Sequence, residues 1–401
     1  TTRPVRVSHR NDWFDVSAGR SFTCGLRGAG ELYCWGNNFS NQLGFVGPDE
    51  DNPMRVGTAA DWTSVSAGSD HACGQRAGGT YCWGSNTFGQ IGDGTTTTPT
   101  APVLVNISTI NPVAGDQHTC ASGFGLLFCW GWNAFGQLGD GTTTNRLLPT
   151  WTGLTDLLDY DAGLGHTCAV QNTGTLSCWG LNGEGQVGDG TITNRLSPTT
   201  VGPANIYRQV ATGSLHTCAT IVVLFGATSI YCWGDNFNGA LGDGTTTDRI
   251  TPGIFAGAGS TWGGDLTAGG TYNCVIRSST DAGEMNCWGK SAKGALGTGS
   301  TAIELEPVTP SIPEWQSFGS GLFDTCGVTT GLELWCDGSA GWYPYASNET
   351  WSAVDVGYAH TCGRTVSGEL FCWGLNDDGQ LGIPGITYTG APTQVGTSSG
   401  C

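Results

Sequence analysis

The sequence predicts an all-β protein, a β-propeller of about eight four-stranded blades; seven blades with a degenerate extra unit is the alternative. Two observations predict this fold. Sixteen of the 17 cysteines fall into eight pairs, and each pair lies in a similar unit of about 50 residues. Each unit holds short β-rich segments bounded by glycine-rich turns, which is typical of propeller blades. The first cysteines of the pairs lie at positions 24, 73, 120, 168, 218, 274, 326 and 362.

Each unit is expected to contain the same parts in the same order. An apolar strand ends in Ala-Gly or Gly, as in 62–68, and the next strand carries the first cysteine, as in 71–73. A third strand ends in Cys-Trp-Gly, as in 81–84, and a Gly-Gln-Leu/Ile-Gly-Asp-Gly loop follows, as in 89–94. A short strand near a proline, as in 101–105, completes the unit. Because one blade cannot bury both of its faces alone, we expect the units to stack in a ring.

The repeats place residues 1–395 in a single propeller and residues 396–401 in a flexible C-terminal tail. Pro4–Val7 is similar to the proline-containing strand of other units, so we expect it to pair with C-terminal strands and close the ring. The seventh unit has Trp-Cys-Asp at 335–337 in place of Cys-Trp-Gly and lacks the Gly-Gln-Leu-Gly loop. It keeps both cysteines and the Trp315 strand, which favours eight blades over seven.

Charge and hydropathy exclude two kinds of partner. The formal net charge is −18, from 33 acidic and 15 basic residues, and lysine occurs only at Lys290 and Lys293. A nucleic-acid binder needs a basic stripe that neutralises phosphates, so no nucleic-acid partner is expected. No apolar run approaches the ~20 residues of a membrane-spanning helix, so no direct membrane span is expected.

The paired cysteines are interpreted as cross-strand disulfides, one in each blade. Opposed residues of an antiparallel hairpin have Cα atoms ~4.5–5.5 Å apart, which overlaps the ~4.4–6.8 Å range of disulfides. Zinc is the rival interpretation, since His-x-Cys and a second cysteine offer ligands. However, the histidine position holds Phe22, Tyr272 and Asp324 in three units that keep both cysteines. We therefore expect no metal and no cofactor. The predicted disulfide cysteines are Cys24, Cys34, Cys73, Cys82, Cys120, Cys129, Cys168, Cys178, Cys218, Cys232, Cys274, Cys287, Cys326, Cys336, Cys362 and Cys372.

Two further sets of repeated polar residues receive structural interpretations. The repeated histidines are expected to form structural hydrogen bonds inside their blades. The aspartates of the Gly-Asp-Gly-Thr loops are expected to stabilise turns through backbone hydrogen bonds. Carboxylates and loop carbonyls also suit calcium, which is the alternative interpretation of these aspartates. The histidines are His71, His118, His166, His216 and His360, and the aspartates are Asp93, Asp140, Asp189 and Asp243.

Disulfides at this density are typical of proteins outside the cytosol, so we expect a secreted or cell-surface protein, with the periplasm as an alternative. Cys401 has no partner in the pattern, and it is interpreted as a C-terminal anchor or an intermolecular thiol. A free thiol in a frayed tail is the alternative. Asn38, Asn106 and Asn348 begin Asn-x-Ser/Thr sequences, which predicts N-glycosylation if the source organism performs it.

The His-Thr-Cys strand, the Cys-Trp-Gly strand and the loop 136–141 with its counterparts resemble the regulator of chromosome condensation repeat family. The resemblance covers essentially the whole chain, and the cysteine-rich repeats are similar to a secreted, bacterial-type member. It implies a β-propeller, usually of seven blades, whereas this sequence has eight units. Members of the family differ in function: guanine-nucleotide exchange on a small nuclear GTPase, ultraviolet sensing in plants, and β-lactamase inhibition. The resemblance therefore predicts a fold and no single activity.

No catalytic residues are predicted, because neither a Gly-x-Ser-x-Gly elbow nor a phosphate-binding loop of the required spacing occurs. We expect a non-enzymatic extracellular or cell-surface propeller that binds another protein, or itself, as a structural or adhesive component. One alternative is a secreted enzyme inhibitor, as the β-lactamase-inhibiting propeller is. Another is a lectin or a glycan-active enzyme, whose partner would be a glycan.

Overall fold

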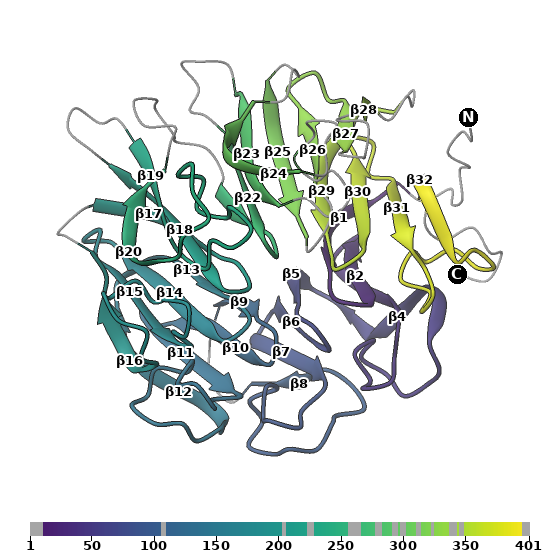
Figure 1. Ribbon diagram of the computed structural model, residues 1–401. Helices are drawn as coiled ribbons and strands as arrows, with labels where there is room; N and C mark the ends of the chain where they lie inside the picture. Colours follow the sequence, from purple (N-terminus) through teal and green to yellow (C-terminus); the bar gives the residue numbers. More distant parts are fainter. Residues whose placement is uncertain are drawn as a thin grey trace.

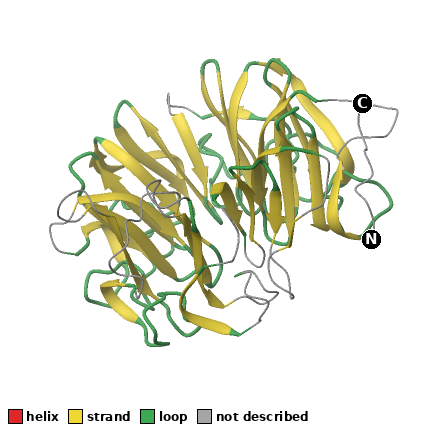
Figure 2. Cartoon of the chain, turned by 90° about the horizontal axis from the view of Figure 1, so that it is seen from above, coloured by secondary structure: helices red, strands yellow, loops and turns green. Residues whose placement is uncertain are grey.

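The β-rich segments of each repeat unit form one four-stranded antiparallel sheet, and eight such sheets surround a common axis (Figure 1). This computed structural model describes residues 11–105, 110–202, 206–222, 228–255, 266–276, 283–290, 296, 302–309, 314–321, 325–336, 343–344 and 349–394. The prediction of an all-β propeller with eight blades is confirmed. Figure 2 shows the described residues as strands and loops, and none of them forms a helix long and apolar enough to cross a membrane.

The strands of each blade follow one another in sequence from the axis outward. Blade one has β1 (Trp13–Ala18), β2 (Phe22–Arg27), β3 (Glu31–Gly36) and β4 (Glu50–Ala60). Blade two has β5 (Trp62–Ala67), β6 (His71–Arg76), β7 (Gly79–Gly84) and β8 (Val103–Leu104). Blade three has β9 (Ile110–Ala114), β10 (His118–Gly123), β11 (Leu126–Gly131) and β12 (Arg146–Thr155). Blade four has β13 (Leu157–Ala162), β14 (His166–Gln171), β15 (Leu176–Gly180) and β16 (Arg195–Thr200).

The second half of the chain repeats this arrangement. Blade five has β17 (Ile206–Thr212), β18 (His216–Val222), β19 (Thr228–Gly234) and β20 (Arg249–Ile254). Blade six has β21 (Leu266–Ala268), β22 (Tyr272–Ile276), β23 (Met285–Lys290) and β24 (Ile303–Val308). Blade seven has β25 (Trp315–Ser320), β26 (Thr325–Thr329), β27 (Leu334–Cys336) and β28 (Tyr343–Pro344). Blade eight has β29 (Trp351–Val356), β30 (His360–Thr365), β31 (Leu370–Leu375) and β32 (Tyr388–Gln394).

The core lies between neighbouring blades, where the tryptophans of six Cys-Trp-Gly strands meet the loop of the preceding blade. Trp179 is fully buried, and its indole Nε1 donates to the carbonyl oxygen of Gln137 in blade three at 2.9 Å. A buried indole N–H usually has a hydrogen-bond acceptor, and here the neighbouring blade supplies it. The same contact recurs for Trp35, Trp83, Trp130, Trp233 and Trp288.

Blades one and eight close the ring by packing side by side. The Trp13 amide donates to the Gly368 carbonyl at 3.0 Å, and the Ala18 amide donates to Asp355 Oδ2 at 2.7 Å. All four described strands of blade eight come from residues 351–394. The expected pairing of Pro4–Val7 with C-terminal strands lies outside the described residues.

The outermost strands share a feature that protects their exposed edges. Proline has no amide hydrogen and therefore disfavours the addition of another strand at an edge. Prolines lie within seven of the eight outermost strands, at Pro53, Pro149, Pro198, Pro252, Pro307, Pro344 and Pro392. The rim of the ring is consequently poorly suited to edge-to-edge β pairing, and the two flat faces remain as interaction surfaces.

Candidate functional site

One face of the ring carries two kinds of connection, and we call it the loop face. Because the strands of a blade are antiparallel, the turn after the innermost strand and the loop between the third and fourth strands lie at the same end of the sheet. In blade one these connections are residues 19–21 and 37–49. The hairpin turn between the second and third strands lies on the opposite face.

An axial depression opens on the loop face, with a volume of about 280 Å³. Its wall consists of the glycine-containing turns that follow the innermost strands. A Cβ atom on Gly68 would lie 2.5 Å from the carbonyl oxygen of Gly115, and one on Gly357 would lie 2.5 Å from that of Gly19. Glycine is therefore required where the turns of neighbouring blades pack backbone against backbone. This packing fixes the wall of the depression.

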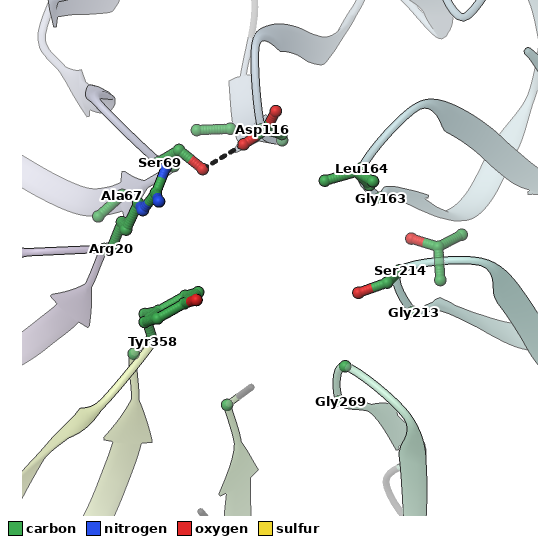
Figure 3. Close-up of a pocket in the computed structure, with 18 of the residues that line it drawn as sticks. Arg20, Ala67, Ser69, Asp116, Gly163, Leu164, Gly213, Ser214, Gly269 and Tyr358 are labelled. Atoms are coloured by element: carbon green, nitrogen blue, oxygen red, sulfur yellow. Dashed lines mark hydrogen bonds between the residues drawn. The ribbon is translucent and has the colours of Figure 1, made fainter. Parts of the chain in front are cut away.

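The side chains around the depression differ from blade to blade (Figure 3). The guanidinium of the exposed Arg20 lies over the Tyr358 ring, 5.4 Å from its centroid. The Ser69 hydroxyl donates to Asp116 Oδ1 at 2.5 Å. Leu164 is 45% exposed on the far side of the opening, beside Ser214. The depression thus has one cationic, one anionic and one apolar part.

The pKa of Asp70 is affected by the charged side chains next to this opening. Partial burial raises the pKa of Asp70, the charge of Arg20 acts to lower it, and the charge of Asp116 acts to raise it. Asp70 is therefore close enough to both Arg20 and Asp116 to be influenced by their charges. Arg20 forms no ion pair within 4.0 Å among the described residues, which leaves its guanidinium edge available.

The β3–β4-type loops are organised by an asparagine whose structural role the sequence analysis did not predict. The fully buried Asn133 donates from Nδ2 to the carbonyl oxygens of Thr142 and Thr144, and its Oδ1 accepts the Leu138 amide at 3.0 Å. One side chain thereby satisfies several backbone groups of a loop that has no ladder of its own. The available signal was an asparagine two residues after the Cys-Trp-Gly glycine, and it recurs at Asn38, Asn86, Asn182, Asn236 and Asn376.

Each of the four loop aspartates accepts hydrogen bonds from residues of its own blade. Asp140 accepts hydrogen bonds from Asn133, from both groups of Thr142 and from the Arg146 guanidinium. Burial acts to raise the pKa of Asp140, but the bonds from Thr142 and Arg146 outweigh it and hold the pKa below its usual value.

The same bonds bear on the calcium alternative. Asp189 and Asp243 have equivalent pairs with Arg195 and Arg249, and Asp93 is bound by Thr95. An arginine on the carboxylate stands where a calcium ion would bind, which argues against calcium at three of these four loops. The described residues also contain no group of three or more side chains that could hold a metal ion.

The folded structure argues against the predicted glycan on Asn38. This side chain is 3% exposed, and its Nδ2 donates to the carbonyl oxygens of Phe45 and Gly47, both at 3.1 Å. The nitrogen that would carry the sugar is therefore buried and already used. Asn106, Asn348 and Cys401 lie outside the described residues.

The buried histidines bridge neighbouring blades, which corrects the expectation of a bond inside each blade. His118 Nε2 lies 3.0 Å from Thr167 Oγ1, and the Thr167 hydroxyl donates to the Gln137 carbonyl at 2.9 Å. Since that hydroxyl has a single hydrogen, His118 Nε2 must carry a proton and donate to Thr167. The equivalent contacts are His71 to Thr119, His166 to Thr217, His216 to Asn273 and His360 to Thr23.

Burial keeps these imidazoles neutral. It lowers the pKa of His118 and His360 to about 4 and that of His71 and His166 to about 3. Groups with such values are uncharged near neutral pH, and their contacts lie inside the wall of the ring. Their role is to hold blades together.

The contact between blades one and two replaces both partners of this bond at once. Phe22 occupies the histidine position and Ala72 the threonine position, and both are fully buried in one apolar cluster. Neither residue leaves a polar atom without a partner. A polar pair and an apolar pair are thus alternative solutions at the same place in the fold.

The sixteen predicted cysteines form eight disulfides, each between directly opposed residues of the second and third strands of a blade. The Cα atoms of the paired residues are 4.1 to 4.2 Å apart. All these cysteines are buried, with 2% exposure at most. Sulfurs paired in this way are not available as zinc ligands. This density of disulfides indicates an oxidising environment of the extracellular type.

A continuous row of apolar side chains crosses the loop face over blades two to four, and we call it the apolar strip. The rings of Phe88 and Trp132 are 6.0 Å apart, and those of Trp132 and Phe135 are 5.1 Å apart. Phe135 and Leu181 both lie against Gly165, next to the exposed Leu164. The apolar strip comprises Phe88, Trp132, Phe135, Leu164 and Leu181.

Comparison with known proteins identifies the repeat. A model of the Regulator of chromosome condensation (RCC1) repeat matches residues 29–74, 77–122, 125–170, 173–220 and 367–401. A second model of this repeat matches residues 15–42 and 351–380. These matches cover more than half of the chain.

Solved structures of similar fold include human WBSCR16, with a TM-score of 0.65 and 20% identity over 91% of this chain and 93% of that chain. They also include Prp20p from Saccharomyces cerevisiae, with a TM-score of 0.61 and 17% identity over 81% of this chain and 85% of that chain. The structure of Prp20p was described together with its binding properties to Gsp1p and histones. At these identities the likeness concerns the fold.

Proposed function

The chain belongs to the regulator of chromosome condensation repeat family, and on that premise we propose that it is a non-enzymatic, secreted or cell-surface propeller that binds another protein with its loop face. The apolar strip is the observation that carries this proposal. The aromatic side chains of the strip are half-buried and continue into the exposed Leu164. A contiguous apolar patch of this kind is typical of protein-binding surfaces, because partner contact removes it from water.

The rigidity of the loops supports binding of a folded partner. The loops of blades two to five are each anchored on the next blade, as where the Gly141 amide donates to the Leu196 carbonyl at 2.7 Å. The internal asparagine fixes the rest of the loop. A surface that is already ordered loses little conformational entropy on binding, so its apolar contacts contribute more of their free energy to affinity.

The distribution of ionisable groups supports a binding role over catalysis. The buried histidines and the loop aspartates are used in structural hydrogen bonds. One carboxylate, Asp116, lines the described wall of the axial depression. Glycoside hydrolysis generally uses two carboxylates facing one site, which this wall does not provide. Placement outside the cytosol is supported by the eight disulfides, since reducing compartments oppose such bonds.

Three immobilised proteins test the proposal: the wild type, Trp132→Ser in the apolar strip, and Phe124→Ser as a matched control. Phe124 is 80% exposed and lies in a β10–β11 turn on the opposite face. Each is incubated with the native extracellular fraction, cross-linked and analysed by quantitative mass spectrometry.

We expect one protein that the wild type and Phe124→Ser retain equally and that Trp132→Ser retains at least roughly tenfold less, as for an interface hot spot. Equal retention by all three proteins would contradict the proposed surface. Inhibition of a captured enzyme would favour the inhibitor function, and Trp132-dependent retention on a glycan array would favour a lectin.

A further inference from the structure

The axial depression places two charged side chains that the proposed protein-binding function does not use beside Leu164, the member of the apolar strip that lines the opening. In ring order, Arg20 projects from blade one, Ser69 from blade two and Asp116 from blade three (Figure 3). Leu164 of blade four faces Arg20 and Tyr358 across the opening. A cation, a carboxylate and an aliphatic side chain therefore surround one small space of about 280 Å³.

From this arrangement we propose that the axial depression binds a zwitterionic α-amino acid with an apolar side chain. Arg20 pairs with the ligand carboxylate, Asp116 pairs with its ammonium group, and Leu164 packs against its side chain. The inference goes beyond the proposed function, because it concerns a small ligand and side chains other than the aromatic part of the apolar strip.

The pairing of opposite charges decides the class of ligand. A simple anion on Arg20 would be repelled by Asp116, and a simple cation on Asp116 would be repelled by Arg20. A zwitterion satisfies both groups. The volume lies near the lower end of the ~300–1,000 Å³ range of small-molecule sites, which suits a single amino acid better than a larger compound.

Both charged groups are held in place before the ligand arrives. Stacking on Tyr358 orients the Arg20 guanidinium, and this leaves the N–H groups at its edge free for a bidentate carboxylate. Asp116 Oδ1 accepts the Ser69 hydroxyl, whereas Oδ2 has no donor among the described residues. The glycine packing fixes the turns that carry these side chains. Such preorganisation reduces the entropic cost of binding.

Isothermal titration calorimetry with L-leucine, L-leucinamide and N-acetyl-L-leucine tests the proposal. The amide lacks the carboxylate, and the acetyl compound lacks the ammonium group. The protein variants are Arg20→Gln and Asp116→Asn, with Asp70→Asn as the matched control. Asp70 carries a charge near the opening but does not line it.

We expect wild type and Asp70→Asn to bind L-leucine with similar Kd values of about 1 mM or tighter. Each of the other variants should bind L-leucine roughly tenfold more weakly, since each loses a charge-assisted hydrogen bond to the ligand. Arg20→Gln should leave the affinity for L-leucinamide unchanged, and Asp116→Asn should leave that for N-acetyl-L-leucine unchanged.

Three results would overturn the assignment. They are the absence of saturable L-leucine binding by the wild type, equal affinity of the wild type for all three compounds, and equal losses for all three compounds in both variants. Because Arg20 and Asp116 are exposed or half-buried turn residues, these substitutions leave the core untouched. Trp132→Ser should bind L-leucine as the wild type does, which separates this result from the test of the protein-binding surface.

Discussion

The contact between blades three and four permits a quantitative test of how the ring is held together. His118 donates to Thr167, and Thr167 donates to the Gln137 carbonyl, all within the buried wall. An apolar pair, Phe22 and Ala72, occupies the equivalent positions between blades one and two. Replacing His118 by Phe and Thr167 by Ala, singly and together, converts one solution into the other.

The expected magnitudes follow from the groups left without partners. Thr167→Ala leaves the buried His118 N–H without its acceptor, which costs about 1–3 kcal/mol of unfolding free energy. The Gln137 carbonyl keeps its Trp179 donor. His118→Phe leaves no buried donor unpaired, because Thr167 still donates to Gln137, so it should cost about 1–2 kcal/mol. The double variant has no unpaired group and should be at least about 1 kcal/mol more stable than the sum of the single costs predicts.

Guanidinium chloride unfolding under non-reducing conditions, followed by tryptophan fluorescence, measures the four stabilities. Thr200→Ala, at an exposed position of β16, serves as the control and should change stability by less than about 0.5 kcal/mol. Additive effects of the two core substitutions, within about 0.5 kcal/mol, would refute the bond between the blades.

Three further outcomes are expected. In folded wild type, burial lowers the pKa of His118 to about 4, whereas the pKa of histidine in the unfolded chain is near 6.5. The unfolded chain therefore binds a proton first as the pH falls, so the free energy of unfolding is highest above pH 6.5 and decreases as the pH falls toward 4. The double variant lacks this group, and its stability relative to wild type should therefore rise by up to about 3 kcal/mol between pH 7 and pH 4; a difference independent of pH would argue against a neutral buried histidine. Replacing Cys168 and Cys178 by Ala removes a disulfide of sequence separation 10 and should lower the unfolding free energy by about 2–3 kcal/mol in the same assay, with no effect expected if the bond does not form in solution. Gly188→Ala should destabilise the protein by more than about 1 kcal/mol and alter tryptophan fluorescence, because φ of Gly188 is 81° and the new Cβ would lie 2.5 Å from Trp233 Nε1. Gly183→Ala is the control, because a Cβ at this position meets no atom within 4 Å. Equal effects of the two substitutions would contradict the packing of Gly188 against Trp233.

The architecture could be predicted from the sequence, because each repeat unit contains the signals for its own blade. Paired cysteines predicted directly opposed residues, as found for Cys168 and Cys178. The Cys-Trp-Gly strands and glycine-rich loops predicted four short strands in each regular unit, whereas the two cysteines and the Trp315 strand predicted the blade of the stunted seventh unit. These are local signals, since hairpin register and turn conformation depend on residues close together in the chain.

The candidate site could not be predicted in the same way, because its residues come from different repeats. Nothing local indicates that Arg20 stacks on Tyr358 from the far end of the chain, or that Asp116 accepts a bond from Ser69 of another blade. Asn38 fits a glycan sequence, yet the fold buries it as the organiser of a loop. The histidines were expected to bond within a blade, but the acceptor nearest to each side chain belongs to the next blade.

The sequence by itself determined the blade, the disulfide pairs and the number of repeats, because spacing within 50 residues decides which strands pair. Only the tertiary structure decided which side chains meet around the axis. Closing the ring brings eight equivalent turns to one opening, so residues about 50 to 340 positions apart become neighbours there. The physical reason is that strand pairing within a blade depends on residues close together in the chain. Which side chains share a surface depends on how the blades pack when the ring closes.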